Sequence, residues 1–353
     1  PHLGREFELM MRSMSRDGML TMRMTELLQK ALLVIPFYGE ESAMRKAFPE
    51  ARAILKAGIE ELPAAERGAV YVSGLAHIDL VWLWQEKHSV RKIANTAMNT
   101  LALIERYPEY IFTFSQPCAF AWLEEHYPDI FKRVQEAVKK GNIDPVGNLW
   151  VEVDCNLAGG EALIRQLLYG RAFYLEKFGK ASDIFLMPDS FGYTGALPQI
   201  MAKSGIKYFL SAKLASNENY RFPYSFFRWQ GIDGTRVPTY LMRVAYNGEV
   251  NCNHLDQAYH RQECKRIIDE SYMTFGYGDG GGGPDDTMLQ FSRRLTNMPG
   301  IPKLKMATLD AFFEKATQRK DEFPVWNDEL YFDRHRGTYT TQAKVKKNNR
   351  KAE

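Results

Sequence analysis

Residues 69–85 read AVYVSGLAHIDLVWLWQ, and this stretch decides the fold class. A short apolar run, 69–75, is followed at once by a polar pair, His77 and Asp79, and then by two tryptophans. A run of this length is typical of a buried strand and too short for most helices. Because polar residues follow the run directly, the stretch predicts a strand of a parallel sheet whose carboxyl end contributes to a site.

The same pattern recurs along the chain. Further apolar runs that we interpret as strands lie at 110–116, 143–153, 184–188, 208–212, 237–242, 273–278 and 304–309. Helical patterns separate them, such as 118–141 and 159–179, which both end near glycine. This alternation predicts an α/β fold with a mostly parallel central sheet surrounded by helices. We expect it to resemble a seven-stranded β/α barrel.

Three parts are expected along the chain. Residues 1–65 show apolar residues three and four apart and predict a helical lead-in. The α/β domain is expected over 66–340. Residues 341–353, which are strongly charged, are expected to begin a helical bundle that is cut short; this end and the absence of an initial methionine suggest a piece of a longer protein.

The amino-acid composition limits the kinds of binding partner that the chain is expected to have. The 353 residues include 46 basic and 43 acidic side chains, so the net charge of +3 argues against nucleic acid or an anionic membrane as partner. A neutral or weakly charged substrate fits better, and homo-oligomerisation stays open. Four cysteines without a CxxC pair predict free thiols in a reducing compartment. No apolar stretch approaches the ~20 residues of a membrane span and no signal peptide is evident, so we expect a cytoplasmic protein.

Acidic and imidazole side chains gather at the predicted strand ends: His77, Asp79, Asp154, Asp189 and Asp279. Residues two apart in an extended segment share a face, so His77 and Asp79 point the same way. An imidazole nitrogen and a carboxylate oxygen are common zinc ligands. The alternative for this pair is a core histidine bonded to a neighbouring acid.

Two of these acids lie in distinctive turns. Asp189 follows the strand of IFLMPDSFGYTGALPQI, where the alternative is an ordinary turn aspartate. Asp279 lies in FGYGDGGGGPDD, whose consecutive glycines predict unusual dihedral angles or a close approach to another group. No Lys-Ser/Thr follows this run, so it is not a nucleotide phosphate loop. A solvated turn is the alternative for Asp279.

Aromatic residues near the acids suggest sugar stacking, because pyranose rings present apolar faces to aromatic side chains. The candidates for such faces are Trp82, Trp84, Phe191 and Tyr246, and for Trp84 the alternative is a core position. Asp154 and Arg228 are additional candidates for substrate contact. For Asp154 the alternative is structural hydrogen bonding, and for Arg228 it is an exposed position on a strand.

Six motifs in order resemble the glycoside hydrolase family 38 α-mannosidases, and most of all their bacterial and cytosolic branch. They read AHIDLVWLW, GNLWVEVDCNLAGGEALIRQ, MPDSFGYTGALPQIMAKSGIKYF, FRWQGIDGTRV, FGYGDGGGGPDD and HRGTYTTQAKVKKNNRKAE, and the resemblance covers the chain from about Gly68 onward. It implies an α/β catalytic domain, followed by a helical bundle and β-domains. It also implies a retaining hydrolase that removes terminal α-linked mannose from oligosaccharides, with zinc holding the sugar hydroxyls.

Residue by residue, the resemblance implies that His77, Asp79 and Asp189 bind the zinc. It implies that Asp189 is also the nucleophile and Asp279 the acid/base, while Trp82 and Phe191 form the substrate platform. The family's fourth ligand is a histidine beyond the point where this sequence stops. The metal identity stays open, since another divalent ion suits such ligands.

Two alternatives remain. One is a carbohydrate-binding piece with an incomplete metal site and no turnover. The other is a different zinc-dependent barrel hydrolase, such as a polysaccharide deacetylase. That class needs a His-x-x-x-His pair, and no two of the seven histidines have this spacing.

Overall fold

The computed structural model describes residues 4, 7, 18–63 and 66–353. Within these residues the chain forms ten strands, most of them short. They are β1 (Glu66–Leu75), β2 (Phe112–Phe114), β3 (Ile143–Pro145), β4 (Ile184–Leu186), β5 (Tyr208–Ser211), β6 (Phe226–Gln230), β7 (Arg236–Leu241), β8 (Glu270–Phe275), β9 (Pro302–Met306) and β10 (Val325–Trp326).

Helices alternate with these strands, as the sequence predicts. The α-helices are α2 (Gly18–Leu33), α3 (Glu41–Glu61), α4 (Glu86–Arg106), α5 (Pro117–His126), α6 (Pro128–Lys140), α7 (Gly160–Phe178), α8 (Leu197–Lys203), α9 (Cys252–His260), α10 (Asp286–Leu295), α11 (Leu309–Ala316) and α12 (Ala343–Ala352). Three 3₁₀ segments, η1 (Lys213–Ser216), η2 (Thr317–Glu322) and η3 (Arg336–Tyr339), occupy connections.

The strands form two five-stranded sheets. The first has the order β3-β2-β1-β8, with β9 also paired to β1, and all its pairs are parallel. Strand β1 is long enough for three partners: β8 and β9 flank most of it, while Gly74 and Leu75 at its carboxyl end pair with β2. The second sheet has the order β10-β6-β7-β5-β4 and is parallel except for the β6–β7 hairpin.

The predicted α/β class with a mostly parallel sheet flanked by helices is confirmed. All eight predicted strands are present, although most are shorter than expected or begin a few residues away. Strands β6 and β10 were not predicted. The described residues contain two hydrogen-bonded sheets instead of one sheet of seven strands, and closure into a barrel stays a prediction.

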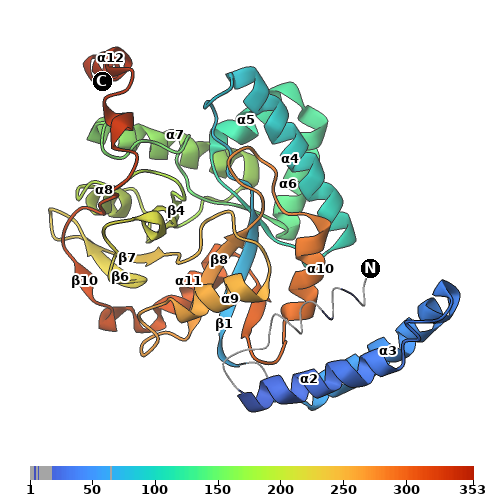
Figure 1. The fold of residues 1–353 in the computed structure, drawn as a ribbon. Coiled ribbons are helices and arrows are strands. Elements are labelled where there is room, and N and C mark those ends of the chain that lie inside the picture. The colour runs from blue at the N-terminus through green and yellow to red at the C-terminus, as the bar shows by residue number, and fades with distance from the viewer. Residues whose placement is uncertain (1–3, 5–6, 8–17, 64–65) are drawn as a thin grey trace.

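A layer of buried side chains joins the two sheets. Tyr240 of β7 and Tyr272 of β8 come from different sheets, yet the Tyr240 hydroxyl donates to the Tyr272 carbonyl at 3.1 Å and accepts from its amide at 3.0 Å. Phe312 of α11 packs against both rings. This layer fixes the relative position of the sheets, so that side chains at their carboxyl ends can meet. Helices α4, α5 and α6 form a group on one side of the first sheet (Figure 1).

The predicted helical lead-in is confirmed where the structure describes it. Helices α2 and α3 pack side by side and project from the body of the chain (Figure 1). Much of 1–17, together with 64–65, lies outside the described residues, and the expected boundaries at 65 and 340 stay predictions. Among the described helices, none is long and apolar enough to cross a bilayer. None of the four cysteines forms a disulfide bond, as expected, and all four are buried.

Candidate active site

The carboxyl ends of both sheets meet at one cleft of about 370 Å³. His77 follows β1 and Glu152 follows β3 in the first sheet, whereas Asp189 follows β4 in the second. The cleft is lined by residues 77–81, 116, 151–154 and 189–191. The site therefore needs both sheets, because neither one supplies all the polar groups.

His77 lies at the centre of these groups, and its ring is only 5% exposed. Its Nε2 lies 3.6 Å from Oδ1 of Asp79 and 3.7 Å from Oδ2 of Asp189, and its Nδ1 lies 3.5 Å from Oε2 of Glu152. These separations exceed normal hydrogen-bond lengths. Both ring nitrogens are buried without a hydrogen-bond partner in the described residues.

The donor set suits a metal ion. Two ligands that each lie about 2.1 Å from a tetrahedral ion are about 3.4 Å apart, close to the spacing of Nε2 from Asp79 and Asp189. Buried polar atoms without partners are rare unless something else satisfies them. Asp279 also fits, because His77, Asp189 and Asp279 each place one ligand atom within 4.8 Å of the others.

Negative charge dominates around His77. Burial alone would lower the pKa of this imidazole, but the charge of Glu152, contact with Asp79 and the charge of Asp189 hold it well above its usual value. A cation between these groups would relieve the same excess of negative charge. The excess of negative charge and the spacing of the donor atoms therefore both indicate a bound cation.

Lys213 is a site residue that sequence reasoning missed. It begins η1, directly after β5, and its ammonium donates a hydrogen bond to Oδ1 of Asp189. Burial raises the pKa of Asp189, while the neighbouring His77 and Lys213 lower it. The two oxygens of Asp189 thus have different neighbours, Lys213 at Oδ1 and His77 at Oδ2. Its position directly after a predicted strand, 208–212, was the available signal.

The glycine-rich turn places Asp279 above this cluster. Gly276 has φ 136°, and a β-carbon there would lie 2.2 Å from the carbonyl oxygen of Leu75. The amide of Gly281, which has φ 78°, donates to the His77 carbonyl at 3.2 Å. The expectation of unusual dihedral angles and close approach is confirmed, because the turn packs directly on the backbone of the loop after β1.

Tyr246 connects Asp279 to the histidine. Its hydroxyl donates a hydrogen bond to Oδ1 of Asp279, and its ring centroid lies 4.9 Å from that of His77. Burial and the charges of Asp189 and Asp279 raise the pKa of Tyr246 far above its usual value. Tyr246 is therefore a neutral hydrogen-bond donor to Asp279 over the whole physiological range.

One side chain braces two loops of the cleft. Gln116 lies in the left-handed region with φ 66°, just after β2. Its Nε2 donates to the Ile78 carbonyl at 3.0 Å, and its Oε1 accepts from the amide of Glu152 at 3.1 Å. Ser115 donates to Oε1 of Glu152 at 3.0 Å. These contacts hold the Glu152 carboxylate beside His77.

Of three predicted substrate residues, Phe191 and Asp154 line the cleft and Trp82 does not. Phe191 lines it, and the Lys213 ammonium lies 4.7 Å from its ring centroid. Asp154 also lines it but is exposed, and its Oδ1 accepts from the amides of Asn156 and Leu157. Trp82 is 58% exposed and packs edge-on against Trp84, and it does not line the cleft.

Arg228 lies away from the cleft. It is on β6, where Nε donates to the Phe323 carbonyl at 3.2 Å and Nη1 lies 3.8 Å from Asp321. The structure does not place Arg228 in the lining of the cleft, and its predicted substrate contact stays a prediction. The alternation of β6 directs this side chain toward the segment before β10 instead.

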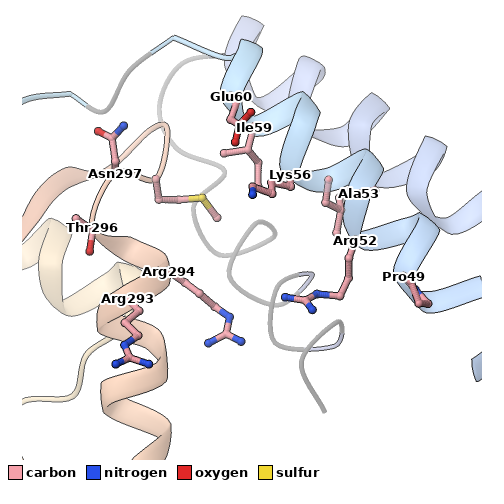
Figure 2. A pocket seen from close by; sticks show the side chains of 12 residues that line it. Pro49, Arg52, Ala53, Lys56, Ile59, Glu60, Arg293, Arg294, Thr296 and Asn297 are labelled. Atoms are coloured by element: carbon pink, nitrogen blue, oxygen red, sulfur yellow. The ribbon is translucent and has the colours of Figure 1, made fainter. Parts of the chain in front are cut away.

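A larger cavity of about 730 Å³ lies between α3 and α10, and it shares no lining residue with the cleft (Figure 2). Arginine and lysine side chains dominate its polar wall, and Glu60 is its one acidic lining residue. Larger volume alone does not make an active site. The cleft at the strand ends has the clustered acids and imidazole that chemistry requires.

A comparison with known families agrees with this geometry. The description "Glycosyl hydrolases family 38 N-terminal domain" matches residues 67–329, which include every residue of the cluster around His77. The chain belongs to glycosyl hydrolase family 38. The predicted family is thus confirmed.

Family 38 relatives extend beyond the matched domain. Over 314 residues the chain is 38% identical to "Alpha-mannosidase 2C1" of Homo sapiens, covering 89% of this chain and 30% of that protein. It is 39% identical over 285 residues to "Alpha-mannosidase G" of Dictyostelium discoideum, covering 80% of this chain and 26% of that protein. The chain thus spans less than a third of the length of either relative.

A family 38 fold is also found among solved structures. An α-mannosidase from Enterococcus faecalis superposes with a TM-score of 0.63 at 19% identity, covering 75% of this chain and 31% of that one. At this identity the match supports the fold of the domain. The arrangement of strands and helices around the cleft is therefore shared with a family 38 protein.

Proposed function

We propose that the protein is a cytoplasmic, retaining α-mannosidase that hydrolyses terminal α-linked mannose from oligosaccharides. The observation that carries this proposal is the convergence of Asp79, Asp189 and Asp279 on the buried His77 ring. Relatives named as α-mannosidases, 38–39% identical, support the choice of sugar. Four buried cysteines without a disulfide bond are in keeping with a reducing compartment.

We propose that His77, Asp79 and Asp189 hold a divalent ion, which we expect to be zinc. Both the donor spacing and the unpartnered imidazole nitrogens support this ligand set. When bound, the ion supplies a Lewis-acid contact for sugar hydroxyls, which orients the ring.

We infer that Asp189 and Asp279 form the carboxyl pair of a retaining mechanism. Retaining glycosidases place their two carboxyl groups about 5 to 5.5 Å apart. One ligand atom of Asp189 lies within 4.8 Å of one ligand atom of Asp279, which supports a double displacement over the wider spacing of inverting enzymes.

In the first step, an oxygen of Asp189 forms a bond to the anomeric carbon while the bond to the leaving oxygen breaks. Protonated Asp279 gives its proton to that oxygen. In the second step, Asp279 takes a proton from water, the water oxygen bonds to the anomeric carbon, and the Asp189 ester bond breaks. Each residue returns to its initial state.

Neighbouring side chains prepare both carboxyl groups. Lys213 donates to Oδ1 of Asp189, which favours its ionised form and restrains the carboxylate. Tyr246 donates to Oδ1 of Asp279, which restrains the second carboxyl group. These hydrogen bonds set the distance between nucleophile and acid before substrate binds.

The test uses the protein that contains this chain, its Asp189→Asn variant and Asp183→Asn as a matched control. Asp183 pairs with Lys207 at the surface. We expect zinc in the wild type, hydrolysis of an aryl α-mannoside with the α-anomer formed first by ¹H NMR, and a loss of at least about 10³-fold in kcat for Asp189→Asn alone. Near-normal turnover in that variant would exclude Asp189 as nucleophile.

A further inference from the structure

A second cavity of about 410 Å³ adjoins the catalytic cleft, and the two share the side chain of Phe191. Its walls come from residues 156–157, 191–194 and 329–339. We propose that this cavity binds the neutral hexose to which the terminal mannose is attached. The inference rests on the proposed function and deepens it, because it assigns residues to the leaving-group sugar.

Close backbone packing holds part of the lining of this cavity in place. Tyr193 and Leu330 exchange two backbone hydrogen bonds of 2.9 Å, which fix residues 329–332 against the turn after Asp189. Gly192, directly before Tyr193, has φ 111°, and a β-carbon there would lie 3.3 Å from the Leu330 carbonyl oxygen. The close approach therefore depends on glycine.

Side-chain hydrogen bonds hold the residue that the two cavities share, Phe191. The Tyr339 hydroxyl donates to the Phe191 carbonyl at 2.6 Å and accepts from Nδ2 of Asn156 at 2.8 Å. Phe191 and Phe332 stack with centroids 6.1 Å apart. These contacts hold Phe191 in place, and Asp189 lies two residues before Phe191 in the chain. The cavity is therefore fixed in position relative to Asp189. Such a preformed site binds its ligand at a smaller entropic cost than a mobile one.

The lining has the chemistry of a sugar site. Tyr331 is 39% exposed and offers an aromatic face, with the Arg336 guanidinium 4.6 Å from its ring centroid. The Glu329 carboxylate is exposed and has no hydrogen bond or ion pair within the described part of the chain. An aromatic face beside a carboxylate and a guanidinium matches the apolar face and hydroxyl edge of a pyranose.

Charge selects a neutral sugar over a charged one. Glu329 and Arg336 are the two ionic lining residues, and their charges cancel. A phosphorylated or carboxylated sugar would bring a net negative charge without a matching excess of cations. A hexose with hydroxyl groups alone satisfies both side chains by hydrogen bonds.

The experiment compares two substrates that share the terminal mannose. An aryl α-mannoside lacks the hydroxyl groups of a second sugar, whereas α1,2-, α1,3- and α1,6-linked mannobioses contain them. The variants are Glu329→Gln and Tyr331→Ala in the full-length protein. Glu314→Gln serves as the matched control, because Glu314 is exposed on α11 and outside both hollows.

We expect each variant to lower the ratio of kcat/KM for the preferred mannobiose to kcat/KM for the aryl mannoside at least tenfold, mainly through KM. The control should leave this ratio within twofold. A ratio unchanged in both variants overturns the inference, even if both activities fall together. Wild-type hydrolysis of the aryl mannoside without any mannobiose also overturns it. A wild type that hydrolyses neither substrate instead refutes the proposed function.

Discussion

The Glu152 carboxylate lies 3.5 Å from Nδ1 of His77, on the side of the ring opposite to Asp79 and Asp189. A carboxylate in this position favours the tautomer that carries its proton on Nδ1. Nε2 is then left with its lone pair toward the acids, as a ligand atom must be. Glu152 thus supports the proposed metal site without being one of its predicted ligands.

Glu152→Gln is expected to weaken zinc binding about 10- to 100-fold, because an amide orients the imidazole less strongly than a carboxylate does. Competition with a chromophoric chelator measures the affinity directly. Glu136→Gln, at an exposed position on α6, is the control. Equal affinities of Glu152→Gln and wild type would show that the ring orientation does not depend on this carboxylate.

Lys213→Met is expected to reduce kcat/KM by roughly 100-fold, because a charge-assisted hydrogen bond to the Asp189 nucleophile is lost. Lys213→Arg should recover part of the activity, since it restores a cationic donor. Steady-state kinetics on an aryl α-mannoside measures both. Lys207→Met removes a surface partner of Asp183 and should have no comparable effect. Equal losses in the Met and Arg variants would indicate a packing role instead.

Gly276→Ala is expected to destabilise the protein by about 2 kcal/mol or more, because its φ of 136° and the close Leu75 carbonyl exclude a β-carbon. Gly280→Ala is the matched control. A β-carbon added at Gly280 would have Nζ of Lys92 as its nearest neighbour, at 3.5 Å. Urea unfolding compares the two variants, and similar midpoints would contradict the close packing of this turn on β1.

The raised pKa of Asp144 leads us to expect a pH dependence of the unfolding free energy that is unrelated to catalysis. Burial raises the pKa of this carboxyl to about 6, although Lys180 lies 3.7 Å away. The folded chain then holds the proton more tightly than the unfolded chain does. The contribution of this group to the unfolding free energy is therefore full below about pH 4 and is lost as the pH rises to about 6.

Asp144→Asn should consequently be more stable than the wild type at pH 8, by on the order of 2 kcal/mol, with little advantage at pH 4. Chemical unfolding at a series of pH values measures the difference. Asp129→Asn, at an exposed position in the first turn of α6, is the control. A constant difference between pH 4 and pH 8 would contradict the raised pKa.

Local patterns predicted much of the site because parallel strands bring their carboxyl ends together. His77, Asp189 and Asp279 each follow a buried strand, and this rule sufficed to group them. The same rule extends to Lys213 after β5. Lys213 was missed because a lysine in a polar turn usually faces solvent. The sequence alone does not show that the Asp189 carboxylate lies opposite it.

Local patterns do not determine where the side chains of Arg228 and Trp82 lie, and neither residue lines the cleft. The direction of Arg228 depends on which face of β6 meets the segment before β10, a tertiary contact with no local signal. Trp82 lies in an irregular segment where the two-residue alternation of a strand no longer applies. Strand β10 has two residues and is defined by its pairing partner, so periodicity does not reveal it.

The side-chain amide of Gln116 affects how substitutions act on the cluster around His77. A single planar group joins the carbonyl of residue 78 to the amide of residue 152. A shift in either loop is thereby transmitted to the other. The His77 imidazole and the Glu152 carboxylate are therefore expected to move together. Replacing this one glutamine would release both loops at once, and with them the His77 ring and the Glu152 carboxylate.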